Sequence, residues 1–129
     1  MLVTHRVGED YSQLLLCDFG SAIDGNTGQE NVTPYLVSRF YRAPEITLGL
    51  VPTYAIDLWS LAVTAAEIFL GKVLFHGKSN SDMLYIMMQR MGPISHRLIR
   101  QHLAQSKKFP IPVHFTQDVS TFLHFFRPC

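Results

Sequence analysis

The stretch Ala55–Leu70 constrains the fold of this chain more than any other segment. It contains no glycine or proline and is apolar on most sides, which predicts one helix buried nearly all round. Gly71 favours a stop there, and Lys72 places a cation where the helix dipole stabilises it. Asp57 and Glu67 interrupt the run, and a bilayer-spanning helix needs about twenty apolar residues. We therefore interpret it as a buried core helix.

Short elements are expected before this helix. Met1–Thr4 and Leu14–Cys17 are apolar runs typical of strands, and they could pair as a hairpin around a polar turn. Ser21–Val32 is polar and predicts a loop. Pro44–Gly49 favours a short helix, with proline at an early position and glycine as its stop.

Further helices are expected after it. Ser79 begins a cap sequence for a helix that ends at Gly92, and Ser95 favours another over about residues 97–104. Four methionines at helical spacing predict core packing rather than a partner-binding groove: Met83, Met87, Met88 and Met91. The pattern weakens towards the C-terminus, where three phenylalanines could share one face: Phe122, Phe125 and Phe126.

Charge and cysteine content exclude several classes. The chain has 11 basic and 10 acidic side chains, so net charge builds no nucleic-acid or membrane surface. Only Cys17 and Cys129 are present, which gives no disulfide framework and indicates a reducing, intracellular setting. The six histidines show no metal-ligand spacing. Hydrophobic residues make up 47%, which suits a piece of a larger protein whose faces are covered by neighbours.

Two motifs give the chemistry. Asp18-Phe19-Gly20 stands near the start, and Ala43-Pro44-Glu45 follows it after a loop that carries serine, threonine and tyrosine. Each tripeptide alone is a weak signal, but in this order they bracket a protein kinase activation segment. Asp57-Leu58-Trp59-Ser60 follows at kinase spacing.

The chain resembles the carboxy-terminal lobe of a CMGC-group eukaryotic protein kinase. Thr33-Pro34-Tyr35 and the run from Leu36 to Glu45 are most similar to the pre-mRNA-processing factor four kinases, which are related to the dual-specificity tyrosine-regulated kinases. The resemblance implies part of a protein kinase-like α+β fold, namely the mainly α-helical C-lobe preceded by a short β-hairpin. It divides the chain into a partial kinase domain, residues 1–105, and a poorly matching tail, residues 106–129.

The resemblance assigns the first motif to the cofactor. It implies that Asp18 chelates the Mg²⁺ that bridges the ATP phosphates, since this hard cation takes oxygen ligands. It also implies that Phe19 packs under the regulatory helix of the amino-terminal lobe and that Gly20 gives the backbone freedom to turn.

It assigns the rest of the activation segment to regulation and substrate binding. Tyr35 matches the tyrosine phosphorylated in this group, and a phosphate there would add roughly −2 charge that arginines can pair with. Arg39 and Arg42 are the nearest candidates. Ser38 stands where kinases usually have threonine and would help hold the catalytic loop and the substrate.

Two further positions are structural by resemblance. Glu45 normally pairs with an arginine that has no recognisable match here, so its loop could be loose. Asp57, with Trp59 beside it, would anchor the catalytic loop by accepting backbone N–H bonds. The chain departs from the family at Ala62, where glycine is usual, and at His76, where proline is usual.

The other catalytic parts fall outside the matched stretch. Met1-Leu2-Val3 aligns with the residues just after the metal-binding asparagine, so the Gly-rich loop, the strand lysine, the helix glutamate and the catalytic aspartate are not expected in this chain. No catalytic residue is therefore assigned, and we expect these residues to be inactive alone. The missing amino-terminal lobe is an expected partner.

The sequence leads to a hypothesis with one alternative. The hypothesis is a serine/threonine protein kinase that uses ATP and Mg²⁺, acts on protein substrates including splicing factors, and is nuclear by resemblance. It binds neither nucleic acid directly nor a membrane. The alternative is a non-catalytic, kinase-derived fragment that serves as a protein-interaction module.

Overall fold

The structure of the protein, a computed structural model, describes residues 2–5, 12–22 and 37–114. Tyr35 and the phenylalanine-rich tail lie outside these residues. The described elements, in chain order, are the strands β1 (Leu2–His5) and β2 (Ser12–Leu15), the 3₁₀ turns η1 (Phe19–Ser21) and η2 (Arg39–Tyr41), and the helices α1 (Pro44–Thr47), α2 (Ala55–Leu70), α3 (Asn80–Met91) and α4 (His96–Ser106).

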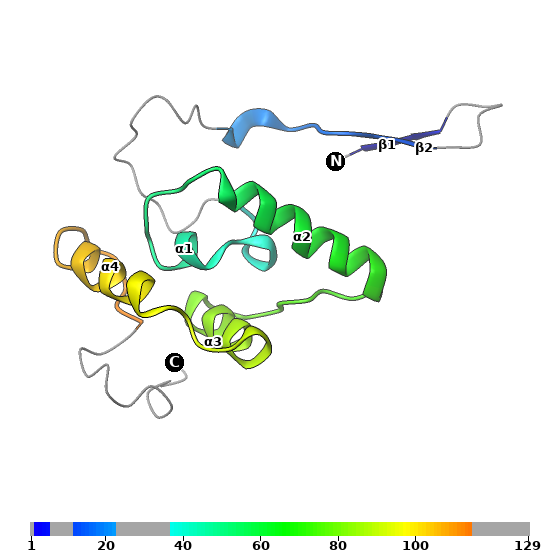
Figure 1. The fold of residues 1–129 in the computed structure, drawn as a ribbon. Coiled ribbons are helices and arrows are strands. Elements are labelled where there is room, and N and C mark those ends of the chain that lie inside the picture. Colours follow the sequence, from blue (N-terminus) through cyan, green and yellow to red (C-terminus); the bar gives the residue numbers. More distant parts are fainter. Residues whose placement is uncertain (1, 6–11, 23–36, 115–129) are drawn as a thin grey trace.

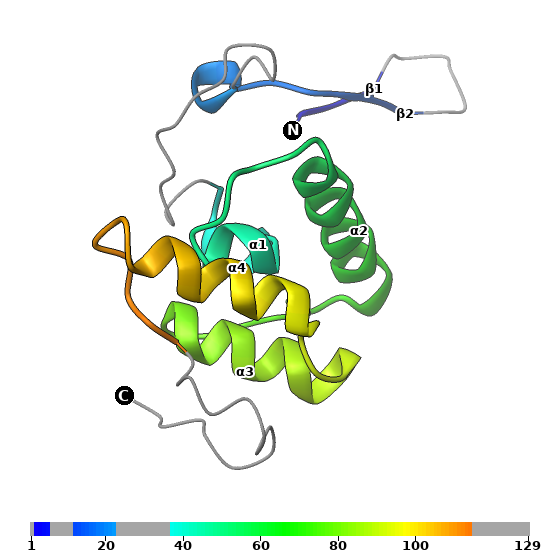
Figure 2. The same ribbon diagram turned by 60° about the vertical axis from the view of Figure 1, so that its left-hand side comes forward.

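The helices form one group and the strands lie at its edge (Figure 1). β1 and β2 are antiparallel, with Leu2 opposite Leu15 and His5 opposite Ser12. η2 contacts both α2 and α3, and α1 contacts α3. The turned view shows α4 in front of α1 and running alongside α3 (Figure 2).

The helix boundaries follow local capping rules. α2 ends where predicted, because Gly71 adopts the left-handed conformation with φ 68°. Ser79 begins α3 as predicted, since its hydroxyl accepts the backbone N–H of Asp82 at 3.1 Å. Ser95 caps α4 in the same way, although α4 runs to Ser106, a little beyond the predicted end.

The core lies on both sides of α3. Between α2 and α3, the buried cluster consists of Val63, Phe75, Met83 and Met87. On the other side of α3, next to α1 and α4, the cluster consists of Leu48, Leu50 and Leu84. The methionine prediction is confirmed for the two core members, whereas Met91 is 61% exposed.

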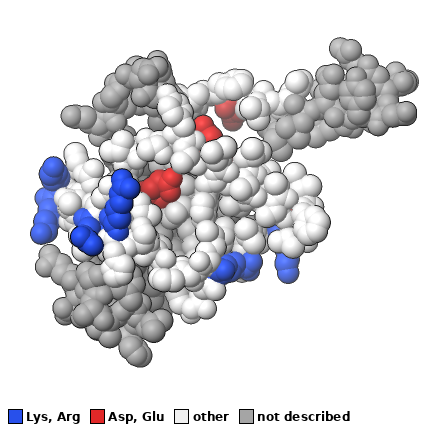
Figure 3. Space-filling model, viewed as in Figure 1, with Lys and Arg blue, Asp and Glu red and all other residues white. Residues whose placement is uncertain are grey.

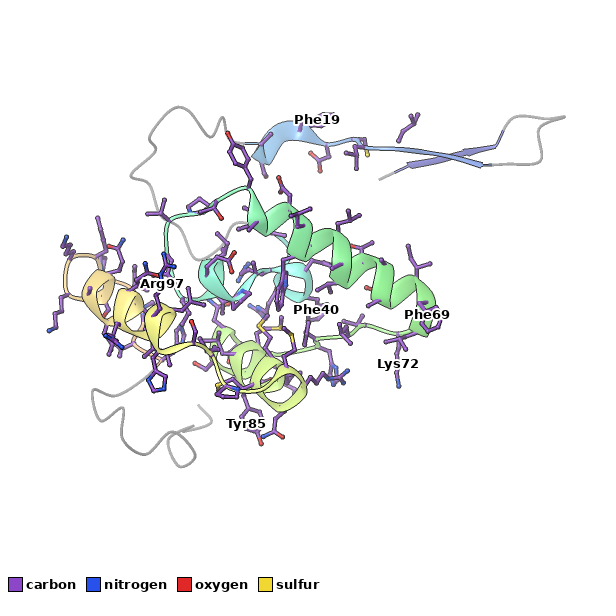
Figure 4. The ribbon with its side chains drawn as sticks, in the orientation of Figure 1. Phe19, Phe40, Phe69, Lys72, Tyr85 and Arg97 are labelled. Carbon is purple, nitrogen blue, oxygen red and sulfur yellow. The ribbon has the colours of Figure 1, made fainter. Side chains whose placement is uncertain are left out.

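The prediction that α2 is buried nearly all round is wrong for this structure. Val63 is its only buried residue, while Leu58, Leu61 and Ile68 are 62–70% exposed and Phe69 is 89% exposed. Among the described residues, α2 packs on one side only, against η2 and Phe75. The remaining sides therefore face outward, as Phe69 does in Figure 4.

Within the described ranges, no helix has the length and apolar character that crossing a bilayer requires.

Candidate active site

The first predicted motif forms an exposed turn after β2. Asp18 has φ 66° and ψ 67°, the left-handed region, which an aspartate adopts at a cost of about 1 kcal/mol. Phe19 and Gly20 continue into η1, and the Phe19 side chain is 69% exposed and labelled in Figure 4. The Asp18 carboxylate is thus accessible to a ligand.

This turn fits one part of a magnesium site. Mg²⁺ in kinases is held by one or two carboxylates, with phosphate oxygens and waters completing the octahedron. Asp18 can supply one such oxygen. The described residues contain no group of three or more histidine, cysteine, aspartate or glutamate side chains that could hold a metal ion. A complete site would therefore need ligands other than these.

The second motif leads from two residues of extended backbone, Arg42 and Ala43, into α1. Val37 has φ 66°, which a β-branched side chain rarely adopts. The Ser38 side chain is exposed, and its carbonyl accepts the Tyr41 N–H at 3.0 Å, which closes η2. Ala43 is 1% exposed and its carbonyl accepts both the N–H and the hydroxyl of Thr47. The backbone here is fixed by local hydrogen bonds.

Two arginines tie this segment to the start of α3. Arg42 is 5% exposed, and its guanidinium donates to the Asn80 Oδ1 at 2.8 Å and to the Val37 carbonyl at 2.9 Å. Arg39 is exposed and donates to the Lys78 carbonyl at 2.5 Å. Their predicted pairing with a phosphate on Tyr35 stays a prediction, because that tyrosine is outside the described residues.

Pro44 and Glu45 begin α1 as the motif predicts. Both are half-buried, and the Glu45 carbonyl accepts the Leu50 N–H at 2.8 Å. The Glu45 side chain forms no ion pair within the described ranges, so the partner expected by resemblance is not among them.

A hydrogen bond that sequence reasoning missed joins Tyr41 to Glu67. The Tyr41 hydroxyl donates to the Glu67 carboxylate at 2.7 Å, and this bond raises the pKa of Tyr41 above its ordinary value. The hydroxyl of Ser60 also donates to the Tyr41 carbonyl at 2.9 Å. The available signal was Glu67 itself, because a carboxylate inside an apolar helix requires a polar partner.

An open pocket of about 470 Å³ lies beside this bond, lined by Tyr41, Thr64, Glu67, Ile68 and Gly71. It therefore combines an apolar wall with one carboxylate at the end of the activation segment.

Asp57 and Trp59 occupy different environments. Asp57 is exposed in the first turn of α2, where its charge is favoured by the helix dipole. Trp59 is half-buried and stacks on Phe75, with ring centroids 5.9 Å apart. Its Nε1 is buried without a hydrogen-bond partner in the described structure, which costs about 1–3 kcal/mol. Trp59 therefore stabilises the fold through apolar packing.

Comparison with known proteins decides the family. A model described as the protein kinase domain matches residues 3–126. This chain belongs to the protein kinase domain family. The mainly helical structure fits the C-lobe of a kinase, and the family generally uses ATP and Mg²⁺. The division of the chain at residue 105 stays a prediction.

Two curated kinases are similar to this chain. Serine/threonine-protein kinase prp4 of Schizosaccharomyces pombe is 40% identical over 111 residues, which cover 86% of this chain and 23% of prp4. Serine/threonine-protein kinase prpf4B of Dictyostelium discoideum is 45% identical over 103 residues, covering 80% of this chain and 12% of prpf4B. The chain thus spans less than a quarter of the length of these two relatives.

Proposed function

We propose that this chain is the C-lobe part of a serine/threonine protein kinase that transfers the γ-phosphoryl group of ATP to protein hydroxyls. The observation that carries the proposal is the end of the activation segment, which bonds to both packed helices. Arg42 links it to α3 through Asn80, and Tyr41 links it to α2 through Glu67. A substrate-binding platform needs this rigidity, because phosphoryl transfer depends mainly on positioning and on charge neutralisation.

The chain's own residues have distinct proposed roles. Asp18 would supply one oxygen ligand to the Mg²⁺ that neutralises the ATP phosphates. Ser38 lies exposed before η2, where a substrate can reach it. Arg39 is exposed and could exchange its bond to the Lys78 carbonyl for a phosphate on Tyr35.

The targets we propose are splicing factors in the nucleus. Support comes from the resemblance of the segment around Tyr35 to the pre-mRNA-processing factor four kinases and from the similarity to prp4 and prpf4B. In the whole kinase, β1 and β2 would form the hairpin that leads to Asp18.

The alternative is an interaction module without catalysis. Its support is the outward side of α2, where Leu58 and Phe69 are 70% and 89% exposed. Residues 1–129 contain no Gly-rich loop, no Val-Ala-Ile-Lys motif and no His-Arg-Asp motif, so these residues alone should transfer no phosphoryl group.

One assay separates the two. The 129-residue chain and the whole kinase that contains it are each given Mg²⁺, ATP and a peptide rich in Ser-Arg repeats. We expect turnover only from the whole kinase, and an Asp18→Asn substitution should lower it by at least about a hundredfold. The control is Lys72→Gln, a change at an exposed residue outside the site. Asp57→Asn is not used as a control, because Asp57 has a proposed anchoring role.

Three results would contradict this proposal. The first is phosphoryl transfer by the 129-residue chain above that of a blank without enzyme. The second is an unchanged turnover rate in the whole kinase with Asp18→Asn. The third is a native protein no heavier than 14.7 kDa on a blot of cell extract. The last result would favour the interaction module.

A further inference from the structure

The outward side of α4 carries a row of cations. Arg97, Arg100, Lys107 and Lys108 are all exposed. The first two lie one helical turn apart, and the lysines follow about two turns later, just past the end of α4. The Lys107 backbone is still helical, so the row continues along one side. Figure 3 shows blue atoms gathered over α4, at the left of that view.

The stretch of chain that carries this row is free of acidic residues, although Figure 3 shows a patch of red atoms beside the blue ones. Residues 83–114 contain no aspartate or glutamate. None of the four side chains forms an ion pair or a hydrogen bond within the described ranges. The opposite side of α4 is fixed by Ile99 and His102, which are 1% and 0% exposed. The backbone of α4 is therefore held with this side towards solvent.

The row also has a defined length and a distinct end. From Arg97 to Lys107 a helix rises by about 15 Å, which equals roughly five residues of an extended peptide. Between them, the exposed positions Gln101 and Ala104 add neither negative charge nor bulk. Just past the lysines, Phe109 is 42% exposed, and its N–H bonds to the Gln105 carbonyl of the last turn.

We propose that this face, formed by Arg97, Arg100, Lys107, Lys108 and Phe109, binds an acidic peptide segment of another protein. Aspartates and glutamates of the peptide would pair with the four cations, and an apolar side chain at one end would cover Phe109. The proposal concerns binding alone and does not depend on the proposed kinase activity.

A peptide fits this face better than a nucleic acid does. Single-stranded nucleic acid is bound by a basic groove with aromatic rings on which successive bases stack. Among the described residues, the row itself carries no aromatic ring, and Phe109 lies only at its end. The net charge of the whole chain is only +1, so the attraction is local rather than a general polyanion field.

The test uses the 129-residue chain and a fluorescent peptide of alternating glutamate and aspartate that ends in leucine. Binding is followed by fluorescence anisotropy at about 0.1 M and about 1 M salt, where the Debye length falls from about 10 Å to about 3 Å. The variant Arg97→Gln/Arg100→Gln/Lys107→Gln/Lys108→Gln removes the row. The matched control, Lys72→Gln/Arg90→Gln, removes two exposed cations elsewhere, one just past α2 and one on α3.

We expect the row variant to bind at least about tenfold more weakly, because four exposed ion pairs of ordinary strength multiply to a factor of that order. The control should bind like the parent, and salt should weaken the parent. Arg97→Glu/Arg100→Glu leaves the row with two negative and two positive charges, so it should abolish the preference for the acidic peptide over a lysine peptide. This variant also serves if the fourfold variant fails to fold.

Three outcomes would overturn the proposal. One is equal peptide binding by the row variant and the parent, which makes the row an ordinary solvated face. Another is tighter binding of a single-stranded RNA than of the acidic peptide. The third is an Arg97→Glu/Arg100→Glu variant that binds the acidic peptide as tightly as the parent does.

Discussion

His102 connects three parts of the fold from a fully buried position, and replacing it tests how the C-terminal segment is held. Its ring is 0% exposed, and its Nδ1 lies 2.7 Å from the Leu48 carbonyl at the end of α1. Its Nε2 accepts the backbone N–H of His114 at 3.2 Å. The ring must therefore be neutral, with its proton on Nδ1. The His114 ring stacks on it and also bonds to the Ser81 hydroxyl at 2.9 Å.

A His102→Phe substitution fills the same space but removes both hydrogen bonds. The Leu48 carbonyl belongs to a residue that is 0% exposed, so leaving it without this partner should cost about 1–3 kcal/mol. The His114 N–H is only half-buried and can reach water, so its loss should cost about 0.5–1.5 kcal/mol. We expect a total near 2–4 kcal/mol, a large part of an ordinary stability of about 5–15 kcal/mol.

The assay is urea unfolding of the 129-residue chain, followed by circular dichroism. His102→Asn should recover part of the loss, because its amide can still donate to the Leu48 carbonyl. His76→Phe, an exposed histidine outside this network, serves as the control and should change the midpoint little. A free energy of unfolding for His102→Phe within about 0.5 kcal/mol of the parent's would refute the reasoning.

The same network predicts a pH dependence with a definite sign. Burial lowers the pKa of His102, although its bond to Leu48 opposes the shift, and burial with the nearby His102 ring lowers the pKa of His114 to about 4. An unfolded histidine titrates near 6.5. Below that pH the unfolded chain binds protons that the folded chain does not.

Stability from this pair should therefore be constant above about pH 6.5 and fall as the pH drops towards about 4. Unfolding midpoints measured down to about pH 5, above the ordinary carboxylate range, should fall more steeply in the parent than in His102→Phe. If the midpoints of the parent and of His102→Phe fell in parallel with pH, the histidine pair would not contribute to the pH dependence of stability.

Three further changes test the site and its supports. Tyr41→Phe should lower the free energy of unfolding by about 0.5–1.5 kcal/mol. Combining it with Glu67→Gln should add little further loss, because both changes remove the same 2.7 Å hydrogen bond. A double-mutant cycle in which the two losses add would contradict this. Gly77→Ala should destabilise by about 1–3 kcal/mol, since its Cβ would lie 2.6 Å from backbone at the start of α3. The Cβ of Gly71→Ala would meet no atom within 4 Å, so that change should cost only the strain of its φ of 68°. Chemical denaturation that ranks the two variants in the reverse order would be inconsistent with this packing. Ser79→Ala should cost about 1 kcal/mol through loss of the α3 cap, and a Ser79→Asp variant that fails to restore it would count against the capping role.

Local signals in the sequence were sufficient to predict that the helices exist. Gly71 and Ser79 end and begin their helices through their own backbone and side-chain chemistry, so their roles follow from residue type. The Asp18 and Glu45 motifs likewise give the family, because each motif is contiguous in the chain. The placement of α2 could not be predicted in the same way. Its composition indicates burial, but burial depends on which other elements pack against it.

The sequence by itself determined the kinase family, the end of α2 and the start of α3, since motifs and caps act over a few neighbouring residues. Only the tertiary structure decided which distant side chains meet. Tyr41 finds Glu67, Arg42 finds Asn80, and His102 finds the Leu48 carbonyl, 54 positions earlier in the chain. Such contacts depend on how the helices cross and on the need of buried polar groups for partners, and neither is encoded in a local pattern.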